Sequence, residues 1–208
     1  MMIFSYAKKG VQWLAFFTCL LLLTTFHYPK VRSLHDISHL PKLHIGDWVL
    51  RQGTTLDSKI IMQVSNSRFS HIGMIVATEP VPLVIHATTD DGYHEKNQVF
   101  LSPLREFLSP NLAHAYMIIR PHFLTLSQKH EIAQRLRQTE GQPFRLATKN
   151  QPHLYCTTLL ADHIQSVLPT FQPHWQAISV PLMQGEYLMP RAFEHYPDTE
   201  ILYQSYPE

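Results

Sequence analysis

One cysteine and two histidines of this chain have the residue types of a thiol nucleophile and its base. Cys156 stands in the stretch HLYCTTLLADHI, His71 in SRFSHIGMIVA and His86 in LVIHATT. A thiol attacks a carbonyl carbon efficiently when a neighbouring base takes its proton, and a third polar group usually orients that base. The three residues therefore predict acyl transfer through a Cys-His-His triad.

Cys156 also has a second interpretation, as a small apolar residue of the core. Behind it, Leu159, Leu160 and Ile164 recur at helical spacing until Pro169, which predicts a helix that begins close to Cys156. The free N–H groups and the positive dipole end at a helix N-terminus favour a thiolate. This placement favours the nucleophile, while the packing interpretation stays open.

The two histidines are expected on neighbouring strands. The residues after His71 and the stretch Leu83–Thr89 around His86 are apolar runs of strand length, and TEPVP between them predicts an antiparallel hairpin. On such a hairpin His86 can hydrogen-bond the His71 ring and fix its tautomer. Gly73 leaves room on the face of His71 for a substrate or a helix. An ordinary structural role is the alternative for each histidine.

Composition narrows the class of protein. The chain has 208 residues, of which 45% are hydrophobic, and 17 basic residues oppose 16 acidic ones. One compact domain is expected, and the balanced charge argues against a nucleic-acid partner. Cys19 is the only other cysteine, so the chain after residue 26 can form no intrachain disulfide. The sequence has no H-E-x-x-H motif, and we expect neither a metal nor a cofactor.

The chain is expected to divide into four segments. Lys8 and Lys9 precede the apolar run Val11–Phe26, so residues 1–26 predict a signal peptide or an uncleaved signal-anchor. Residues 27–43 are expected to be a connector, 44–168 the catalytic core, and 169–208 a cap rich in proline and aromatic residues that packs on the core. The body of the protein is accordingly expected outside the cytoplasm, in the periplasm or cell envelope.

Several blocks, taken in order, resemble a known family. GDWVLRQ from Gly46, SRFSHIGMIV, LVIHAT and LYCTTLLADHI are similar to the permuted papain-like amidases of the YiiX/YaeF type, relatives of the NlpC-type hydrolases and of lecithin retinol acyltransferase. The resemblance runs from Gly46 to about Ile164. It implies an α+β, circularly permuted papain-like fold, in which a small antiparallel sheet packs against the nucleophile-bearing helix. It also implies Cys156 as nucleophile and His71 as base.

The chain departs from the family pattern at three places. The family typically has glutamate at the position of His86, and a neutral imidazole there is expected to stabilise a charged His71 less than a carboxylate would. Thr157 and Thr158 replace a serine-glutamate pair, and Arg145 replaces an acidic residue. The lost negative charges weaken the case for a cationic amine substrate.

The expected function is an exported cysteine hydrolase that cleaves an amide or ester through a thioester acyl-enzyme. Tyr155 is a candidate hydrogen-bond donor to the oxyanion, and Ser70 and Thr157 are further candidates for oxyanion or substrate contacts. Peptide, cell-wall and lipid-derived substrates all suit this chemistry. The alternatives are an acyltransferase and a catalytically weak or inactive envelope binding protein with the same fold. A metal-binding protein would explain the 14 histidines but not Cys156.

Overall fold

The computed structural model describes residues 36–89, 96–181 and 183–206. The expected signal segment 1–26 and residues 27–35 of the expected connector lie outside these ranges. Within them, no helix is both long enough and apolar enough to cross a membrane.

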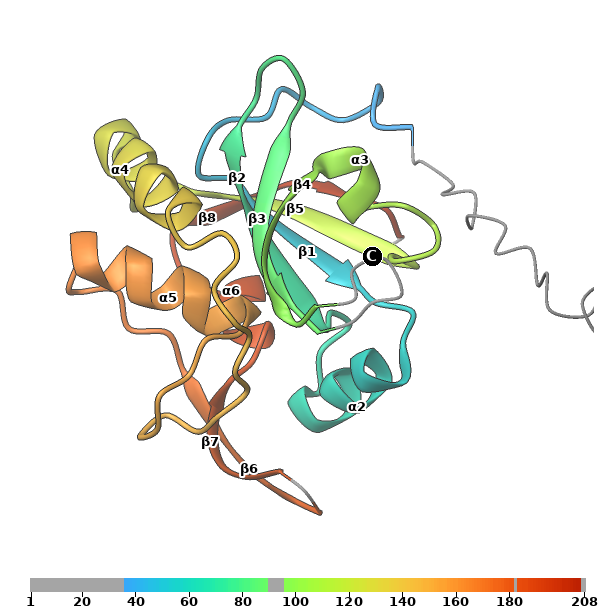
Figure 1. Cartoon of the computed structure of the whole chain (residues 1–208). Helices are drawn as coiled ribbons and strands as arrows, with labels where there is room; N and C mark the ends of the chain where they lie inside the picture. Colours follow the sequence, from blue (N-terminus) through green and yellow to red (C-terminus); the bar gives the residue numbers. More distant parts are fainter. Residues whose placement is uncertain (1–35, 90–95, 182, 207–208) are drawn as a thin grey trace, which may run out of the picture. The chain divides into compact units, whose positions relative to one another are not determined.

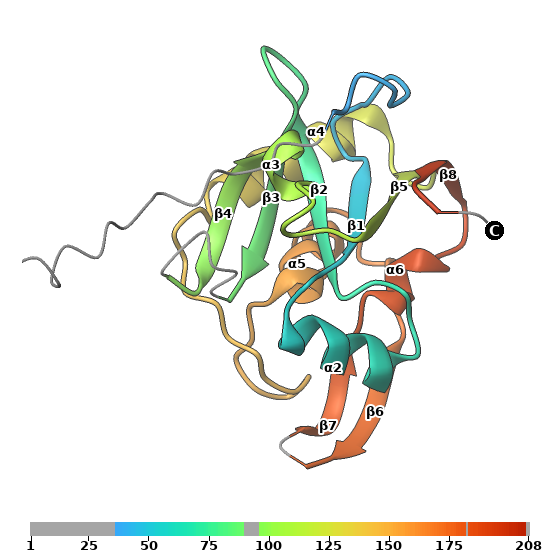
Figure 2. The ribbon, with the colours of Figure 1, turned by 90° about the vertical axis from the view of Figure 1, so that its right-hand side faces the viewer.

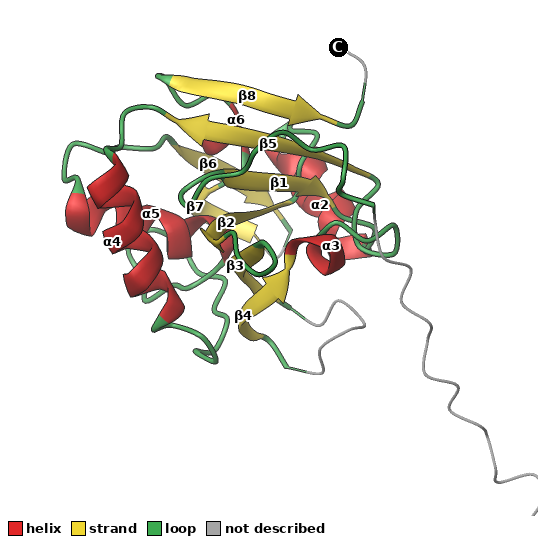
Figure 3. Ribbon diagram, turned by 90° about the horizontal axis from the view of Figure 1, so that it is seen from above, coloured by secondary structure: helices red, strands yellow, loops and turns green. Residues whose placement is uncertain are grey.

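A six-stranded sheet forms the centre of the described chain, in the order β4-β3-β2-β1-β5-β8 (Figures 1 and 3). Each neighbouring pair is antiparallel. The strands are β1 Trp48–Gln52, β2 His71–Ala77, β3 Leu83–Thr88, β4 Gln98–Pro103, β5 Ala115–Pro121 and β8 Thr199–Gln204. The predicted hairpin of the two histidine strands is therefore confirmed as β2 and β3.

Helices cover both faces of this sheet. They are α2 Leu56–Ser65, α3 Leu104–Phe107, α4 Leu126–Arg137, α5 Cys156–Val167 and α6 Arg191–Glu194. The helices α4 and α5 lie side by side over one face, and the short α3 lies on the other (Figures 1 and 3). The predicted α+β class and the packing of the Cys156 helix on an antiparallel sheet are confirmed.

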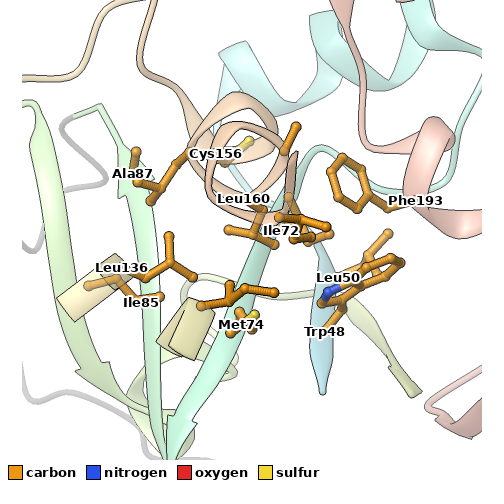
Figure 4. Packing of buried hydrophobic residues seen from close by; sticks show 14 of the residues in the cluster. Trp48, Leu50, Ile72, Met74, Ile85, Ala87, Leu136, Cys156, Leu160 and Phe193 are labelled. Atoms are coloured by element: carbon orange, nitrogen blue, oxygen red, sulfur yellow. The ribbon is translucent and has the colours of Figure 1, made fainter. Parts of the chain in front are cut away.

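Alternation along the strands divides the core between the two faces. Beneath α5, the buried residues include Leu50, Ile72 and Met74, and Figure 4 shows Leu160 of α5 above them. The other face buries Val49 and its neighbours against α3, and Ile37, Leu40 and Leu43 pack there too. The described part of the expected connector is thus packed against the core.

The segment 169–208 differs from the expected cap in one respect. Its aromatic residues do pack on the core, where Phe171 and Phe193 surround Trp48. However, β8 pairs with β5 and so completes the main sheet from outside the expected core of 44–168. The remainder forms the hairpin of β6 Trp175–Val180 and β7 Met183–Leu188, which lies beside α2 (Figure 2), and α6.

The positions of the prolines in residues 169–208 are compatible with the strands and the helix of this segment. They fall between its elements rather than inside them, and so interrupt no strand or helix. The positions are Pro173, Pro181, Pro190 and Pro197.

Candidate active site

Cys156 is the first residue of α5, which agrees with the predicted start of the helix close to Cys156. The preceding residue, Tyr155, has an extended backbone and caps the helix, and the hydroxyl of Thr158 accepts a hydrogen bond from its N–H at 2.9 Å. Backbone N–H groups of Ile72 and Thr157 lie close enough to Cys156 to lower the pKa of its thiol. The start of α5 therefore reaches the beginning of β2, next to His71.

His71 and His86 form the hydrogen bond that their strands predicted. His71 Nε2 lies 3.0 Å from His86 Nδ1, and His86 Nε2 lies 3.0 Å from the hydroxyl of Ser102 on β4. All three side chains are buried. The contacts make a line of three polar groups across β2, β3 and β4, and they leave Nδ1 as the nitrogen of His71 that faces away from His86.

Gly73 has a different use from the one expected. A Cβ atom at this position would come within 2.4 Å of Val84 Cγ1 and 3.3 Å of His86 Cβ. The space beside Gly73 is thus filled by β3 and not by a substrate or a helix. The glycine lets the two strands approach closely enough for their histidines to meet.

Arg51 and Phe107 complete the surroundings of the histidines, and the sequence analysis assigned neither. Arg51 pairs directly with His71 across β1 and β2, is 4% exposed, and donates from Nη1 to the carbonyl of Phe107 at 2.9 Å. Its guanidinium lies 4.5 Å from the centroid of the Phe107 ring. That ring also lies 5.5 Å from the ring of His71 and 4.9 Å from that of His86.

Burial makes the uncharged forms of this site the stable ones. Burial raises the pKa of the Cys156 thiol to about 11, although the nearby N–H groups and the Arg51 charge act in the opposite direction. Burial, followed by the charges of Arg51 and His86, holds the pKa of His71 well below its ordinary value. The expectation that the helix N-terminus yields a thiolate is therefore corrected, since desolvation outweighs the helix N–H groups.

The weaker sequence candidates mainly organise the site. The hydroxyl of Tyr155 accepts from the N–H of Leu188 at 2.9 Å, and the hydroxyl of Thr157 donates to the carbonyl of Leu188 at 2.6 Å. Both side chains thereby tie the first turn of α5 to β7. Ser70 accepts from the N–H of Gly53 at 3.0 Å. Each of the three hydroxyls thus has a partner within the protein, and the expected contacts of these residues with an oxyanion or a substrate stay a prediction.

A cavity of about 380 Å³ opens on the candidate residues. Cys156, His71 and Arg51 line it together, as do Ser70, Tyr155 and Thr157. Its other walls come from α2, from the segment around residues 144–146 and from the end of β7, and they are largely apolar. The apolar residues of these walls are Ile60, Ile61, Phe144, Leu146, Met183 and Leu188, and Leu112 joins them from the loop before β5. The arrangement can place an apolar group beside a thiol and an imidazole.

Sequence signals for the missed residues were weak. Arg51 lies in the GDWVLRQ block, but its role depends on a cross-strand register that one sequence does not give. Ser102 reaches His86 from the strand on the far side of β3, next to a proline that obscures the strand. Phe107 looks like any core aromatic until its ring is seen between Arg51 and the histidines.

Comparison with known proteins gives structural similarity but no sequence match. No family model matches the chain, and no curated protein matches its sequence. Among solved structures, the chain is similar to the crystal structure of the metalloprotein yiiX from Escherichia coli O157:H7. The TM-score is 0.65 at 20% sequence identity, and the match covers 79% of this chain and 98% of the other. The chain therefore has a YiiX-like fold.

Proposed function

We propose that this protein is a cysteine hydrolase of the permuted papain-like type, which cleaves an amide or ester bond through a thioester on Cys156. The observation that carries the proposal is the shared cavity, which Cys156 enters from the start of α5 and His71 from the start of β2. The His71–His86–Ser102 line supplies the orientation that a base requires. The YiiX-like fold and the chain order, histidine before cysteine, agree with it.

The reaction begins from a neutral thiol and a neutral imidazole. For Nδ1 of His71 to accept a proton, Nε2 must carry one and donate it to His86 Nδ1, and His86 then donates from Nε2 to Ser102. His71 Nδ1 takes the Sγ proton as Sγ attacks the carbonyl carbon. N–H groups at the start of α5 stabilise the oxyanion.

The second half of the reaction restores the enzyme. The bond between the carbonyl carbon and the leaving group breaks, and the proton on His71 moves to that amine or alcohol. Water then loses a proton to His71 and attacks the thioester, the S–C bond breaks, and Sγ recovers the proton. An alcohol or amine in place of water would make the protein an acyltransferase, which the same residues would serve.

The cavity favours substrates with an apolar acyl part. Side chains such as Ile61, Phe144 and Met183 surround the space next to Cys156, so burial of an apolar group there is favourable by roughly 25 cal/mol per Å² of apolar surface. Among the expected substrate classes, lipid-derived amides and esters fit this lining best. Peptide and cell-wall substrates remain within the same chemistry, provided that an apolar group flanks the scissile bond.

A resident metal does not fit the described residues. The YiiX structure is that of a metalloprotein. In residues 36–89, 96–181 and 183–206 of this chain, no three His, Cys, Asp or Glu side chains converge as metal ligands would. The two ring nitrogens of His86 already contact His71 and Ser102. No step of the proposed reaction uses a metal.

The cellular location is part of the proposal. The basic residues and apolar run of 1–26 support an exported protein that works in the periplasm or cell envelope. This segment supports either a cleaved signal or a membrane anchor.

A second candidate is an envelope binding protein that has the fold without the catalysis. The raised pKa of Cys156 and its low exposure of 8% favour this alternative, because a thiol in that state is a poor nucleophile at neutral pH. The apolar cavity would then hold an acyl ligand without cleaving it.

Trapping the acyl group tests the proposal. The full-length protein is incubated with an envelope extract and with a panel of aryl esters and amides, and intact mass is recorded. We expect a mass increase on Cys156, turnover of one panel member, and loss of both in Cys156→Ala. His71→Ala should slow acylation by roughly 100-fold, within the range for loss of a general base. Cys19→Ser is the matched control and should leave turnover unchanged.

The outcomes separate the two candidates. Turnover that survives Cys156→Ala would overturn the nucleophile assignment. A bound, uncleaved ligand that dissociates on denaturation would instead identify the binding protein.

A further inference from the structure

We propose that Arg51 supplies the positive charge that makes the Cys156 thiolate and the acyl oxyanion accessible in this buried site. The inference rests on the proposed function, because it concerns the charge that the nucleophile develops. The evidence for it is the position of Arg51 in the cavity. Neither histidine can supply a positive charge while it is neutral.

The location of Arg51 is fixed from two sides. Its backbone pairs with His71 on β2 and with Tyr116 on β5, so it lies on a central strand of the sheet. Its guanidinium is held by the carbonyl of Phe107, 2.9 Å from Nη1, and by the Phe107 ring, 4.5 Å from the centroid. The side chain is 4% exposed and lines the same cavity as Cys156. A long, flexible cation is thereby kept beside the reacting groups.

A neutral site needs such a charge when the reaction starts. Proton transfer from Cys156 to His71 creates a thiolate in a poorly hydrated cavity, and attack then moves the negative charge to the carbonyl oxygen. In this setting a fixed cation stabilises negative charge more strongly than it would in water. The charge of Arg51 lowers the pKa of both Cys156 and His71, which favours the thiolate and opposes a resting imidazolium.

No other described side chain is placed to do the same. Besides Arg51, the titratable groups that line the cavity with Cys156 are Asp57, His71 and Tyr155. His86 lies behind His71 in a hydrogen-bonded pair, and the Tyr155 hydroxyl contacts Leu188. Asp57 is acidic and can supply no positive charge. Burial raises the pKa of Tyr155 as well, so it stays neutral. Arg51 is the cation whose charge bears on the thiol of Cys156 among residues 36–89, 96–181 and 183–206.

Two alkylating agents of different charge test this role without any substrate. Iodoacetate is an anion and iodoacetamide is neutral. A cation near Sγ therefore raises the ratio of the alkylation rate with iodoacetate to the rate with iodoacetamide. The ratio is measured on the full-length protein in a Cys19→Ser background, where Cys156 is the remaining thiol. We expect Arg51→Met to lower the ratio about tenfold, which corresponds to about 1.4 kcal/mol. Arg51→Lys should keep the ratio within about twofold of the parent protein.

A matched control and a second measurement keep the result decisive. Arg145→Met removes an exposed charge between two cavity residues, Phe144 and Leu146, and should leave the ratio unchanged. An unchanged ratio in folded Arg51→Met, as judged by circular dichroism, overturns the proposal. If that variant does not fold, the folded parent is compared with the same chain in denaturant, where Arg51 is no longer held beside Cys156. Equal ratios in the two states would also overturn it.

Failure of this inference is distinct from failure of the proposed function. Alkylation reports the charge at Cys156 whether or not a substrate turns over. If no substrate is turned over but the alkylation ratio falls in Arg51→Met, the hydrolase proposal is contradicted. If a substrate is turned over but the ratio does not change in Arg51→Met, the role of Arg51 is contradicted.

Discussion

His86 Nδ1 lies 3.0 Å from His71 Nε2, and this contact determines which nitrogen of His71 is left for chemistry. A carboxylate in the position of His86 would accept the same hydrogen bond and would add a negative charge. The imidazole keeps the geometry without the charge, so the site rests with neutral groups and depends on other sources of electrostatic stabilisation.

Exchanging His86 for glutamate should favour the charged pair of a Cys156 thiolate and a His71 imidazolium. In His86→Glu the carboxylate raises the pKa of His71 and so stabilises the imidazolium that accompanies a thiolate. We expect alkylation of Cys156 by iodoacetamide near pH 7 to accelerate at least about tenfold. His86→Gln has nearly the same shape without the charge and should show no acceleration. Equal rates in the two variants would contradict this electrostatic account.

Alkylation of Cys156 should follow the titration of a buried thiol. With a pKa of about 11, roughly one molecule in 10⁴ carries the thiolate at pH 7, and the rate should rise about tenfold per pH unit. In denaturant the thiol recovers an ordinary pKa, and the profile should shift to lower pH. A rate plateau already present below pH 7 in the folded protein would mean that a thiolate–imidazolium pair exists at rest.

A methyl group at Gly73 should separate the two histidine strands. In Gly73→Ala the new Cβ atom meets Val84 Cγ1 and the carbonyl oxygen of Ile85, at 2.4 Å and 2.9 Å before any adjustment. We expect a loss of about 1–3 kcal/mol in the free energy of unfolding, as for other overpacked core positions. Imidazole resonances of His71 and His86, followed by NMR, should show that their hydrogen bond is weakened. Unperturbed resonances in a fully stable variant would contradict the proposed reason for glycine.

The hydroxyls of Tyr155 and Thr157, which both hydrogen-bond the backbone of Leu188, should together stabilise the start of α5. Thr157→Val removes the donor to the Leu188 carbonyl and should cost about 1–3 kcal/mol of unfolding free energy, because the carbonyl is left buried and unsatisfied. Tyr155→Phe removes the acceptor for the Leu188 N–H at similar cost. Urea unfolding of both single variants and the double variant measures their coupling. Strictly additive losses would show that the two contacts act independently.

Acid should destabilise the fold through His71. Its folded-state pKa is depressed, chiefly by burial, below the ordinary value of about 6.5, so the unfolded chain takes up the proton first. The stability that His71 contributes is fully present above that ordinary value and is lost as the pH falls through the folded pKa. Urea midpoints measured from pH 8 down to pH 4 should show this loss, and His71→Asn should reduce the slope. An identical slope in the variant would assign the acid sensitivity to other groups.

The strong periodic signals of the sequence predicted the elements that carry the site. The apolar runs around His71 and His86 predicted β2 and β3, and the stripe after Cys156 predicted α5, with Cys156 in its first turn. The two strands are buried along almost their whole length, and α5 buries one face, so their patterns reflect the packing that fixes them.

The rest depended on tertiary contacts that a single sequence does not reveal. Burial of Cys156 by surrounding elements reversed the pKa direction expected from the helix terminus alone. The close approach at Gly73 depended on which strand lies beside it. The strand β8 is only six residues long and follows a proline-rich stretch, and five of its residues pair with β5, so its pattern carried little signal.

The pairing of β8 with β5 has a consequence for the newly made chain. The strand β5 can pair with β8 only after residues 199–204 have been synthesised. The first turn of α5 likewise gains its hydrogen bond to Leu188 only after that residue has been made. A nascent chain that has just passed Cys156 already contains Arg51 on β1, His71 on β2 and His86 on β3, yet it lacks β7, whose Leu188 holds the first turn of α5, and β8, which pairs with β5. The position of Cys156 thus depends on residues that are synthesised after it, and a product terminated before Leu188 would carry the reacting groups without the contacts that hold the start of α5.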